Sequence, residues 1–154
     1  MEKGFLKQSI DLAKENIENE GGPFGAVIVK DGEVIATGCN RVTANNDPTA
    51  HAEVMAIRAA CSKLNTFNLE GCEIYSSCEP CPMCLAAIYW AHIDKLYYAA
   101  DKHDAADAGF DDSFIYKEFE SAPDQRRLVM QRGLPEEAKA VFEMWKQKTD
   151  KTEY

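Results

Sequence analysis

The stretch "CEIYSSCEPCPMCLAAIYWAHIDKLYYAA" (residues 72–100) decides the fold, because its pattern changes from strand to helix and back to strand. Residues 72–77 and 95–100 combine apolar and aromatic side chains as short strands do. Between them, two prolines begin a helix that ends near Ala91, since proline suits the first turn of a helix. This segment therefore predicts two strands separated by a helix.

The segments before this stretch extend the alternation. "FGAVIVKDGEVIATGCN" (24–40) contains two β-rich runs around Asp31-Gly32, which is a strong signal for a hairpin. Asp47 and Pro48 suit the N-cap and the first turn of another helix. Further helical patterns are found at residues 3–19, 48–63, 111–119 and 135–148. The order of the elements predicts an α/β fold in which helices pack on a mixed sheet.

The size of the chain suits a single domain. It has 154 residues, of which 45% are apolar, and this is enough for one compact domain spanning 1–154. No apolar run is long enough to span a membrane, and the N-terminal residues form an amphipathic helical pattern rather than a signal peptide. We therefore expect a cytoplasmic protein, whose six cysteines serve metal binding or chemistry rather than disulfides.

The charge of the chain limits its partners. The net charge is −9, from 26 acidic and 17 basic side chains. Such a surface repels phosphate backbones, whose neutralisation supplies most of the affinity of proteins for nucleic acid. The sequence thus favours a small neutral substrate over a nucleic acid. The best candidate for a local basic patch is "DQRRLVMQR" (124–132), which is more typical of a solvated surface.

Cysteine and histidine are spaced as metal ligands at the beginnings of two predicted helices. Cys81 and Cys84 lie three residues apart and share a helix face, and His51 lies near the start of the preceding helix. Thiolates and imidazole bind Zn²⁺ well, and three protein ligands leave one position open, as in catalytic zinc sites. Glu53, two residues from His51, is suited to move protons beside the metal.

Other interpretations of these residues stay open at this point. Cys78 would close a structural zinc site as a fourth ligand, although this would leave Glu53 without a role. His51 would be a buried structural histidine if it held no metal. The remaining cysteines are expected to be small core residues, namely Cys39, Cys61 and Cys72.

The two motifs match the signature of zinc deaminases, H-x-E followed by P-C-x-x-C, as His51-Ala52-Glu53 and Pro80-Cys81-Pro82-Met83-Cys84. The sequence resembles the cytidine deaminase-like superfamily and, within it, the small bacterial guanine deaminases. "AGFDDSFIYKE" (108–118) and the terminal tyrosine are the more specific marks of guanine deaminases. The other matching stretches are "GGPFGAVIVKDG" (21–32), "NDPTAHAEV" (46–54), "SCEPCPMC" (77–84) and "AIYWA" (87–91).

The resemblance implies a fold and an assembly. The fold would be a three-layer α-β-α sandwich with a five-stranded mixed sheet, whose fifth strand would be "RRLVMQ" (126–131). The assembly would be a homodimer in which the C-terminal segment, residues 121–154, is swapped between subunits. Tyr154 would then close the site of the partner subunit. From composition alone, the same terminus is expected to be frayed.

The resemblance also implies an activity, the zinc-dependent hydrolysis of guanine to xanthine and ammonia. His51, Cys81 and Cys84 would hold Zn²⁺, and Glu53 would take a proton from water and protonate the substrate. Related substrates stay open, namely guanosine, a triazine, cytosine or a tRNA adenosine. A structural zinc module that binds a partner and catalyses nothing is the alternative of another class.

Guanine presents a donor edge, formed by N1–H and the amine, which requires an acceptor such as a carboxylate. Asp112 is the candidate acceptor, with Asp111 as its competitor, although Asp112 would also suit the cap of the following helix. Asn40 suits O6 and N7 of a purine, or else caps the exit of the hairpin. Phe24 would stack on the base or pack in the core, and Trp90 would form part of a pocket wall.

Overall fold

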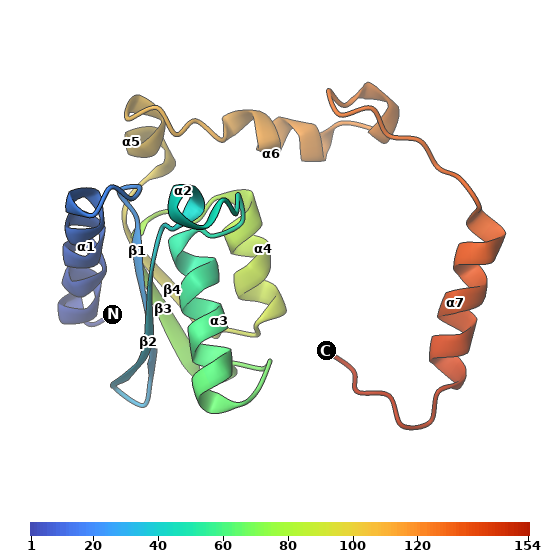
Figure 1. Ribbon diagram of the computed structural model, residues 1–154, viewed down its shortest axis with the longest axis horizontal. Coiled ribbons are helices and arrows are strands. Elements are labelled where there is room, and N and C mark those ends of the chain that lie inside the picture. Colours follow the sequence, from blue (N-terminus) through green and yellow to red (C-terminus); the bar gives the residue numbers. More distant parts are fainter. The chain divides into compact units, whose positions relative to one another are not determined.

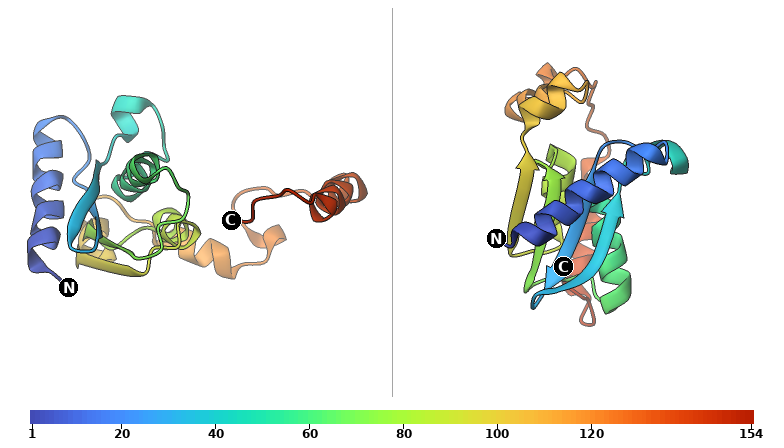
Figure 2. Two further views of the ribbon diagram at one scale, coloured as in Figure 1. Left: turned by 90° about the horizontal axis from the view of Figure 1, so that it is seen from below. Right: turned by 90° about the vertical axis from the view of Figure 1, so that its left-hand side faces the viewer.

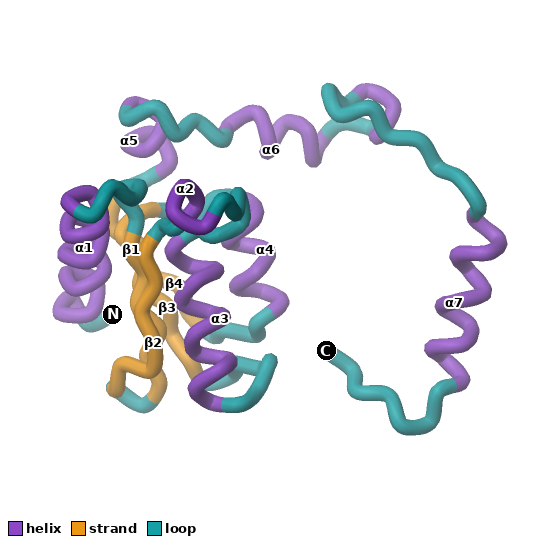
Figure 3. Tube along the Cα trace, viewed as in Figure 1, coloured by secondary structure: helices purple, strands orange, loops and turns teal.

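The computed structural model describes residues 1–154, and the chain divides into two compact units, Met1–Asp112 and Ser113–Tyr154. The first unit holds a single four-stranded sheet with the strand order β2-β1-β3-β4 (Figures 1 and 3). Its elements are α1 (Lys3–Glu18), β1 (Gly25–Lys30), β2 (Glu33–Cys39), α2 (Val42–Asn45), α3 (Ala52–Leu64), β3 (Cys72–Cys78), α4 (Pro82–Trp90), β4 (Lys95–Ala100) and α5 (Lys102–Asp107).

The sheet is mixed and lies between two layers of helices. Strand β1 runs antiparallel to both β2 and β3, and β3 runs parallel to β4. Helix α1 covers one face of the sheet, while α3 and α4 cover the other (Figures 1 and 2). These layers confirm the expected α/β sandwich, and β3, α4 and β4 confirm the strand, helix and strand predicted for residues 72–100.

The fifth strand expected at residues 126–131 is not formed, because the sheet has four strands. This segment follows a short 3₁₀ helix, η1 (Pro123–Gln125), and has no regular structure. Leu128 and Val129 within it are 72% and 82% exposed. A strand needs a neighbouring strand for its backbone hydrogen bonds, and the second unit contains none. The β-prone sequence therefore has no edge within its own unit on which to pair.

The second unit consists of helices α6 (Ser113–Glu120) and α7 (Pro135–Gln147) with η1 between them. The basic residues of the intervening segment pack back onto α6. Arg127 places its guanidinium 5.6 Å from the centre of the Phe114 ring, and its backbone N–H donates to Glu118 at 2.9 Å. None of the helices of the protein combines the length and the apolar character that crossing a membrane would require.

The hairpin predicted at residues 24–40 is confirmed as β1 and β2. Asp31 and Gly32 connect the two strands, and both have positive φ angles, 52° and 79°. This backbone conformation suits the right-handed twist of the strands, and glycine adopts it without steric cost.

Both faces of β1 are buried, and alternate residues of the strand serve the two sides. Ala26 and Ile28 pack with the buried alanines of α3, whereas Val27 and Val29 pack with Tyr75 and with apolar side chains of α1. A strand that is covered on both faces has no polar side to display. This explains why β1 has an apolar sequence along its whole buried length.

Gly38 of β2 allows α3 to lie directly on the sheet. A Cβ atom at this position would meet the carbonyl oxygen of Ala52 and would lie 2.5 Å from the backbone nitrogen of Ala56. Both are backbone atoms, so the helix would have to shift as a whole to make room. The contact fixes the first turns of α3, which begins directly after His51 and contains Glu53.

We expect Gly38→Ala to lower the free energy of unfolding by about 1–3 kcal/mol, because the added methyl group overpacks the contact between sheet and helix. Urea unfolding followed by circular dichroism would measure this loss. Gly4→Ala is the matched control, since a Cβ at Gly4 of α1 meets nothing within 4 Å. That control should change the free energy of unfolding by no more than about 0.5 kcal/mol, as exposed substitutions do. Equal stability of Gly38→Ala and the wild type would contradict the close packing.

Candidate active site

The candidate active site lies at one end of the sheet. Gly25 at the start of β1 pairs with Cys39 at the end of β2, and Cys78 at the end of β3 pairs with Ala100 at the end of β4. Strands β2, β3 and β4 therefore present their carboxyl ends at the same end of the sheet, and α3 and α4 begin there. Ligands of open α/β sheets generally bind outside the carboxyl ends of the strands.

The structure brings the three predicted metal ligands together at this end. His51 is the N-cap of α3, Cys81 is the N-cap of α4, and Cys84 lies in the first turn of α4. The ligand atoms of the three residues lie within 4.8 Å of one another, and His51 Nδ1 is 3.6 Å from Cys81 Sγ. Two sulfur donors and one imidazole form a set that Zn²⁺ binds in tetrahedral sites, with a fourth position left for another ligand.

The charges within this group favour a thiolate. Hydrogen bonding from the Cys84 thiol lowers the pKa of Cys81 to about 4 against the effect of burial, and the His51 ring adds to this lowering. The same hydrogen bond, together with burial, raises the pKa of Cys84. The hydrogen bond with Cys81 also raises the pKa of His51. The group thus carries a thiolate that is ready to bind a cation.

Glu53 lies beside the metal ligands and is only 6% exposed. Burial raises the pKa of its carboxyl group, partly offset by hydrogen bonds from its own backbone N–H, from Cys84 and from Ser76. The Ser76 hydroxyl donates to Glu53 Oε1 at 3.1 Å. A carboxyl group with a raised pKa both takes and gives protons readily near neutral pH. Ser76 was not predictable from the sequence, because a serine in a strand carries no signal of its partner on another element.

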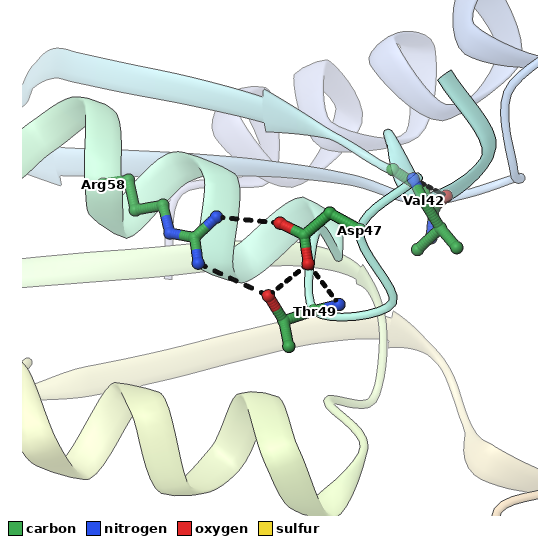
Figure 4. Close-up of polar contacts among 5 residues, drawn as sticks. Val42, Asp47, Thr49 and Arg58 are labelled. Atoms are coloured by element: carbon green, nitrogen blue, oxygen red, sulfur yellow. Dashed lines mark hydrogen bonds and ion pairs between the residues drawn. The ribbon is translucent and has the colours of Figure 1, made fainter. Parts of the chain in front are cut away.

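The loop before α3 is held by a cluster of polar side chains (Figure 4). Asp47 Oδ1 accepts from the backbone N–H and the hydroxyl of Thr49, and Arg58 donates to Asp47 Oδ2 at 3.3 Å. Asp47 therefore does not cap α3 as expected, since its carboxylate is engaged in this turn and His51 occupies the N-cap position. The cluster supports the backbone two residues before His51.

Cys78 does not belong to the group of metal ligands. Its Sγ donates instead to the backbone oxygen of Asp101 at 3.6 Å. Burial and the nearby Glu53 raise the pKa of Cys78 to about 11, so the residue stays a neutral thiol. Zinc binds the thiolate form, and the geometry and the charge agree that Cys78 stands apart.

Two of the predicted substrate-binding residues lie at the same end of the sheet as this group. Asn40 follows β2 and is 9% exposed, and its Oδ1 accepts from Val42 N at 3.3 Å. Phe24 precedes β1 and is half-buried, with its ring edge-to-face against Phe110 at 4.9 Å. A mostly apolar pocket of about 150 Å³ adjoins Phe24, and its lining includes Cys78.

Asp112 is half-buried, whereas its competitor Asp111 is exposed. Burial raises the pKa of Asp112, and the negative charge of Cys81 adds to this effect. The choice of Asp112 over Asp111 as the acceptor for the substrate stays a prediction.

Trp90 and Tyr154 are not brought to the metal ligands within the first unit. Trp90 is the last residue of α4, at the opposite end of the helix from Cys81, and it is 66% exposed. Tyr154 belongs to the second unit and is 75% exposed.

Residues 1–100 match the cytidine and deoxycytidylate deaminase zinc-binding region. The chain belongs to this family of zinc deaminases. One histidine and two cysteines form the group at the end of the sheet, which is a ligand composition that zinc deaminases use.

Within the family, the chain is 53% identical to guanine deaminase of Bacillus subtilis (strain 168) over 151 residues, which is 97% of each chain. The X-ray structure of guanine deaminase from Bacillus subtilis superimposes with a TM-score of 0.97 at 52% identity, covering 100% of this chain and 99% of that one. The chain is also 48% identical over 96 residues to the tRNA-specific adenosine deaminase of Aquifex aeolicus (strain VF5), which covers 62% of this chain and 64% of the relative.

Proposed function

We propose that this protein is a guanine deaminase, which hydrolyses guanine to xanthine and ammonia in the cytoplasm. The observation that carries the proposal is the near full-length match to a guanine deaminase, which includes the second unit, around a buried Glu53 beside three metal ligands. The match to a tRNA-specific adenosine deaminase covers only 62% of the chain. The net charge of −9 also disfavours a tRNA substrate.

His51, Cys81 and Cys84 would hold Zn²⁺. A zinc ion at these ligands supplies the Lewis acidity that makes water a nucleophile near neutral pH. Glu53 accepts a proton from the attacking water and delivers it to N3 of guanine as oxygen bonds to C2. Glu53 then carries the second proton of the water to the amine, the C2–N bond breaks, and ammonia leaves. The product retains hydrogen on N1 and N3 and a carbonyl at C2, which is xanthine.

The side chains near the metal ligands have the chemistry that guanine needs. Asp112 accepts hydrogen bonds from N1–H and the amine, because a carboxylate complements a donor edge. Burial raises the pKa of Asp112, and hydrogen bonds from such donors favour its carboxylate form. Asn40 faces O6 and N7, and the ring of Phe24 stacks on the base.

The proposal extends to the assembly, in which residues 121–154 are exchanged between the subunits of a homodimer. Three apolar residues of helix α7 are mostly exposed to solvent: the exposed fractions of Val141, Phe142 and Met144 are 63%, 67% and 71%. Apolar side chains gathered on one helix favour burial against another surface. In this assembly Tyr154 closes the site of the partner subunit, and Trp90 adds to a pocket wall.

The activity is tested by ammonia release from the zinc-loaded protein, which is offered guanine, guanosine, cytosine, adenine, a triazine related to guanine and a tRNA in parallel. We expect turnover of guanine alone. Turnover of tRNA adenosine in its place would assign the other activity found among the relatives. Turnover of none of these would reject the proposed function in favour of a structural zinc module.

Asp112→Asn sharpens this assay. The change replaces one acceptor oxygen by a donor while it keeps the shape of the side chain. We expect kcat/KM for guanine to fall about 10- to 100-fold, as for loss of a hydrogen bond to a charged group. Asp111→Asn is the matched neighbour and should stay within about twofold of the wild type, as exposed substitutions do. The reverse order of the two variants would move the acceptor role to Asp111.

A further inference from the structure

We infer that Asn16 of helix α1 is a positioning residue for substrate binding, which holds Asn40 and the glycine loop (Gly21–Phe24) at the candidate active site. This inference rests on the proposed function, because it assigns Asn40 and Phe24 to the substrate pocket. Asn16 itself lies on the opposite layer of the sandwich from the metal-ligating helices. It touches no metal ligand, so its influence on the site acts through the backbone that it binds.

Asn16 is a polar residue in the middle of a packed layer. Its side chain is 4% exposed, and its Nδ2 donates both hydrogens to backbone carbonyls, of Gly22 at 2.8 Å and of Asn40 at 2.9 Å. Burying an amide is costly unless its hydrogen bonds are made. Neither carbonyl belongs to the sheet ladder, so the amide of Asn16 adds a second link between the glycine loop and the residue after β2, beside the hydrogen bond from Asn40 N to Phe24 O.

The glycine loop packs closely against the side chains of Asn16 and Asn40. The N–H of Gly21 donates to the backbone oxygen of Asn16 at 2.7 Å. A Cβ at Gly21 would lie 2.6 Å from Cγ of Asn16, and a Cβ at Gly22 would lie 3.1 Å from Cγ of Asn40. Any other residue at Gly21 would displace the amide of Asn16. Close approach of the Asn16 amide therefore requires glycine at position 21, whereas a Cβ at Gly22 would press on the Asn40 side chain by only a few tenths of an ångström.

A displacement of this loop would be transmitted to the site by short backbone links. Phe24 N donates to Gly22 O at 2.8 Å, and Asn40 N donates to Phe24 O at 3.2 Å. Directly after Asn40, the N–H of Arg41 donates to Ala50 O at 2.8 Å, next to the metal ligand in the sequence. Loss of the Asn16 amide thus loosens Asn40 and Phe24, while Glu53 on α3 keeps its own partners.

The predicted signature is a weakening of binding without a matching loss of chemistry. We expect Asn16→Ala to raise KM for guanine about tenfold, in line with the loss of one or two hydrogen bonds, with kcat within about twofold. Gly21→Ala should act in the same direction, because its methyl group pushes the same amide. In the double variant the effect of Gly21→Ala should shrink, since the atoms with which it clashes are gone.

The second measurement does not depend on turnover. Amide hydrogen exchange of the zinc-loaded protein should become faster in residues 21–25 and at Asn40 when Asn16 is replaced by alanine. Asn19→Ala is the matched control, because Asn19 Nδ2 donates only to Glu15 O at 3.0 Å, within the same helix end. It should leave KM and the exchange of the loop unchanged.

The outcomes separate this inference from the proposed function. A wild-type protein that does not deaminate guanine would reject the function, and hydrogen exchange would still decide the role of Asn16. Unchanged exchange in the loop overturns the inference. So does an Asn16→Ala variant that is less stable but has the wild-type KM, or one that loses kcat with KM unchanged.

Discussion

Glu53→Gln is expected to lower kcat for guanine by about 10²- to 10⁴-fold, the usual worth of a general acid and base. Glutamine has the shape of glutamate and can still accept the hydrogen bond that the Ser76 hydroxyl gives to Oε1. It cannot take a proton from water or pass one to N3 and to the amine. Because Glu53 is not one of the grouped ligand residues, the variant should retain the zinc content of the wild type.

Steady-state ammonia release and metal analysis of the same preparation would measure both quantities. Glu73→Gln is the matched control, since Glu73 Oε2 accepts from Tyr75 at 2.8 Å and Glu73 Oε1 pairs with Lys95 at 2.8 Å, at the far ends of β3 and β4. It should keep kcat within about twofold, as substitutions away from the site do. Wild-type kcat in Glu53→Gln would remove Glu53 from the mechanism. Loss of zinc along with activity would make it a structural residue of the metal site.

Local patterns along the chain predicted most of the sandwich. The hairpin around Asp31 and Gly32 was predictable because the turn chemistry and the flanking β-rich runs agree. The strand at residues 126–131 was expected from the family resemblance and not from a local pattern. A strand exists only where a second backbone offers its hydrogen bonds, and no strand lies in that unit.

The grouping of His51, Cys81 and Cys84 was predictable because their spacing places them at the starts of two helices, where His51 and Cys81 are the N-caps. The residues that support the site were not. Ser76 meets Glu53 because β3 packs beside the start of α3. Asn16 meets the backbone of Asn40 because α1 packs over the end of β2. Glu53 and Ser76 lie 23 positions apart in the sequence, and Asn16 and Asn40 lie 24 positions apart. Polar partners of this kind carry no periodicity, so they become visible only when the chain is folded.

Cys84→Ser is expected to abolish both zinc binding and turnover, since a hydroxyl is a poor substitute for a thiolate ligand. The protein should stay folded, because the residues around the site pack in a core that does not depend on a metal for its apolar contacts. Metal analysis, circular dichroism and ammonia release on the purified variant would measure the three properties. Treatment of the wild type with a chelator should give the same combination, with activity restored by added Zn²⁺.

Cys78→Ser decides whether the site is catalytic or structural. Cys78 donates to Asp101 O, and its pKa of about 11 keeps it a thiol, so a serine hydroxyl can make the same hydrogen bond. We therefore expect the variant to keep the zinc content and the turnover of the wild type. Loss of zinc in Cys78→Ser would identify a fourth protein ligand. A fourth ligand would fill the position that water needs, and the deaminase mechanism would have to be abandoned together with the role of Glu53.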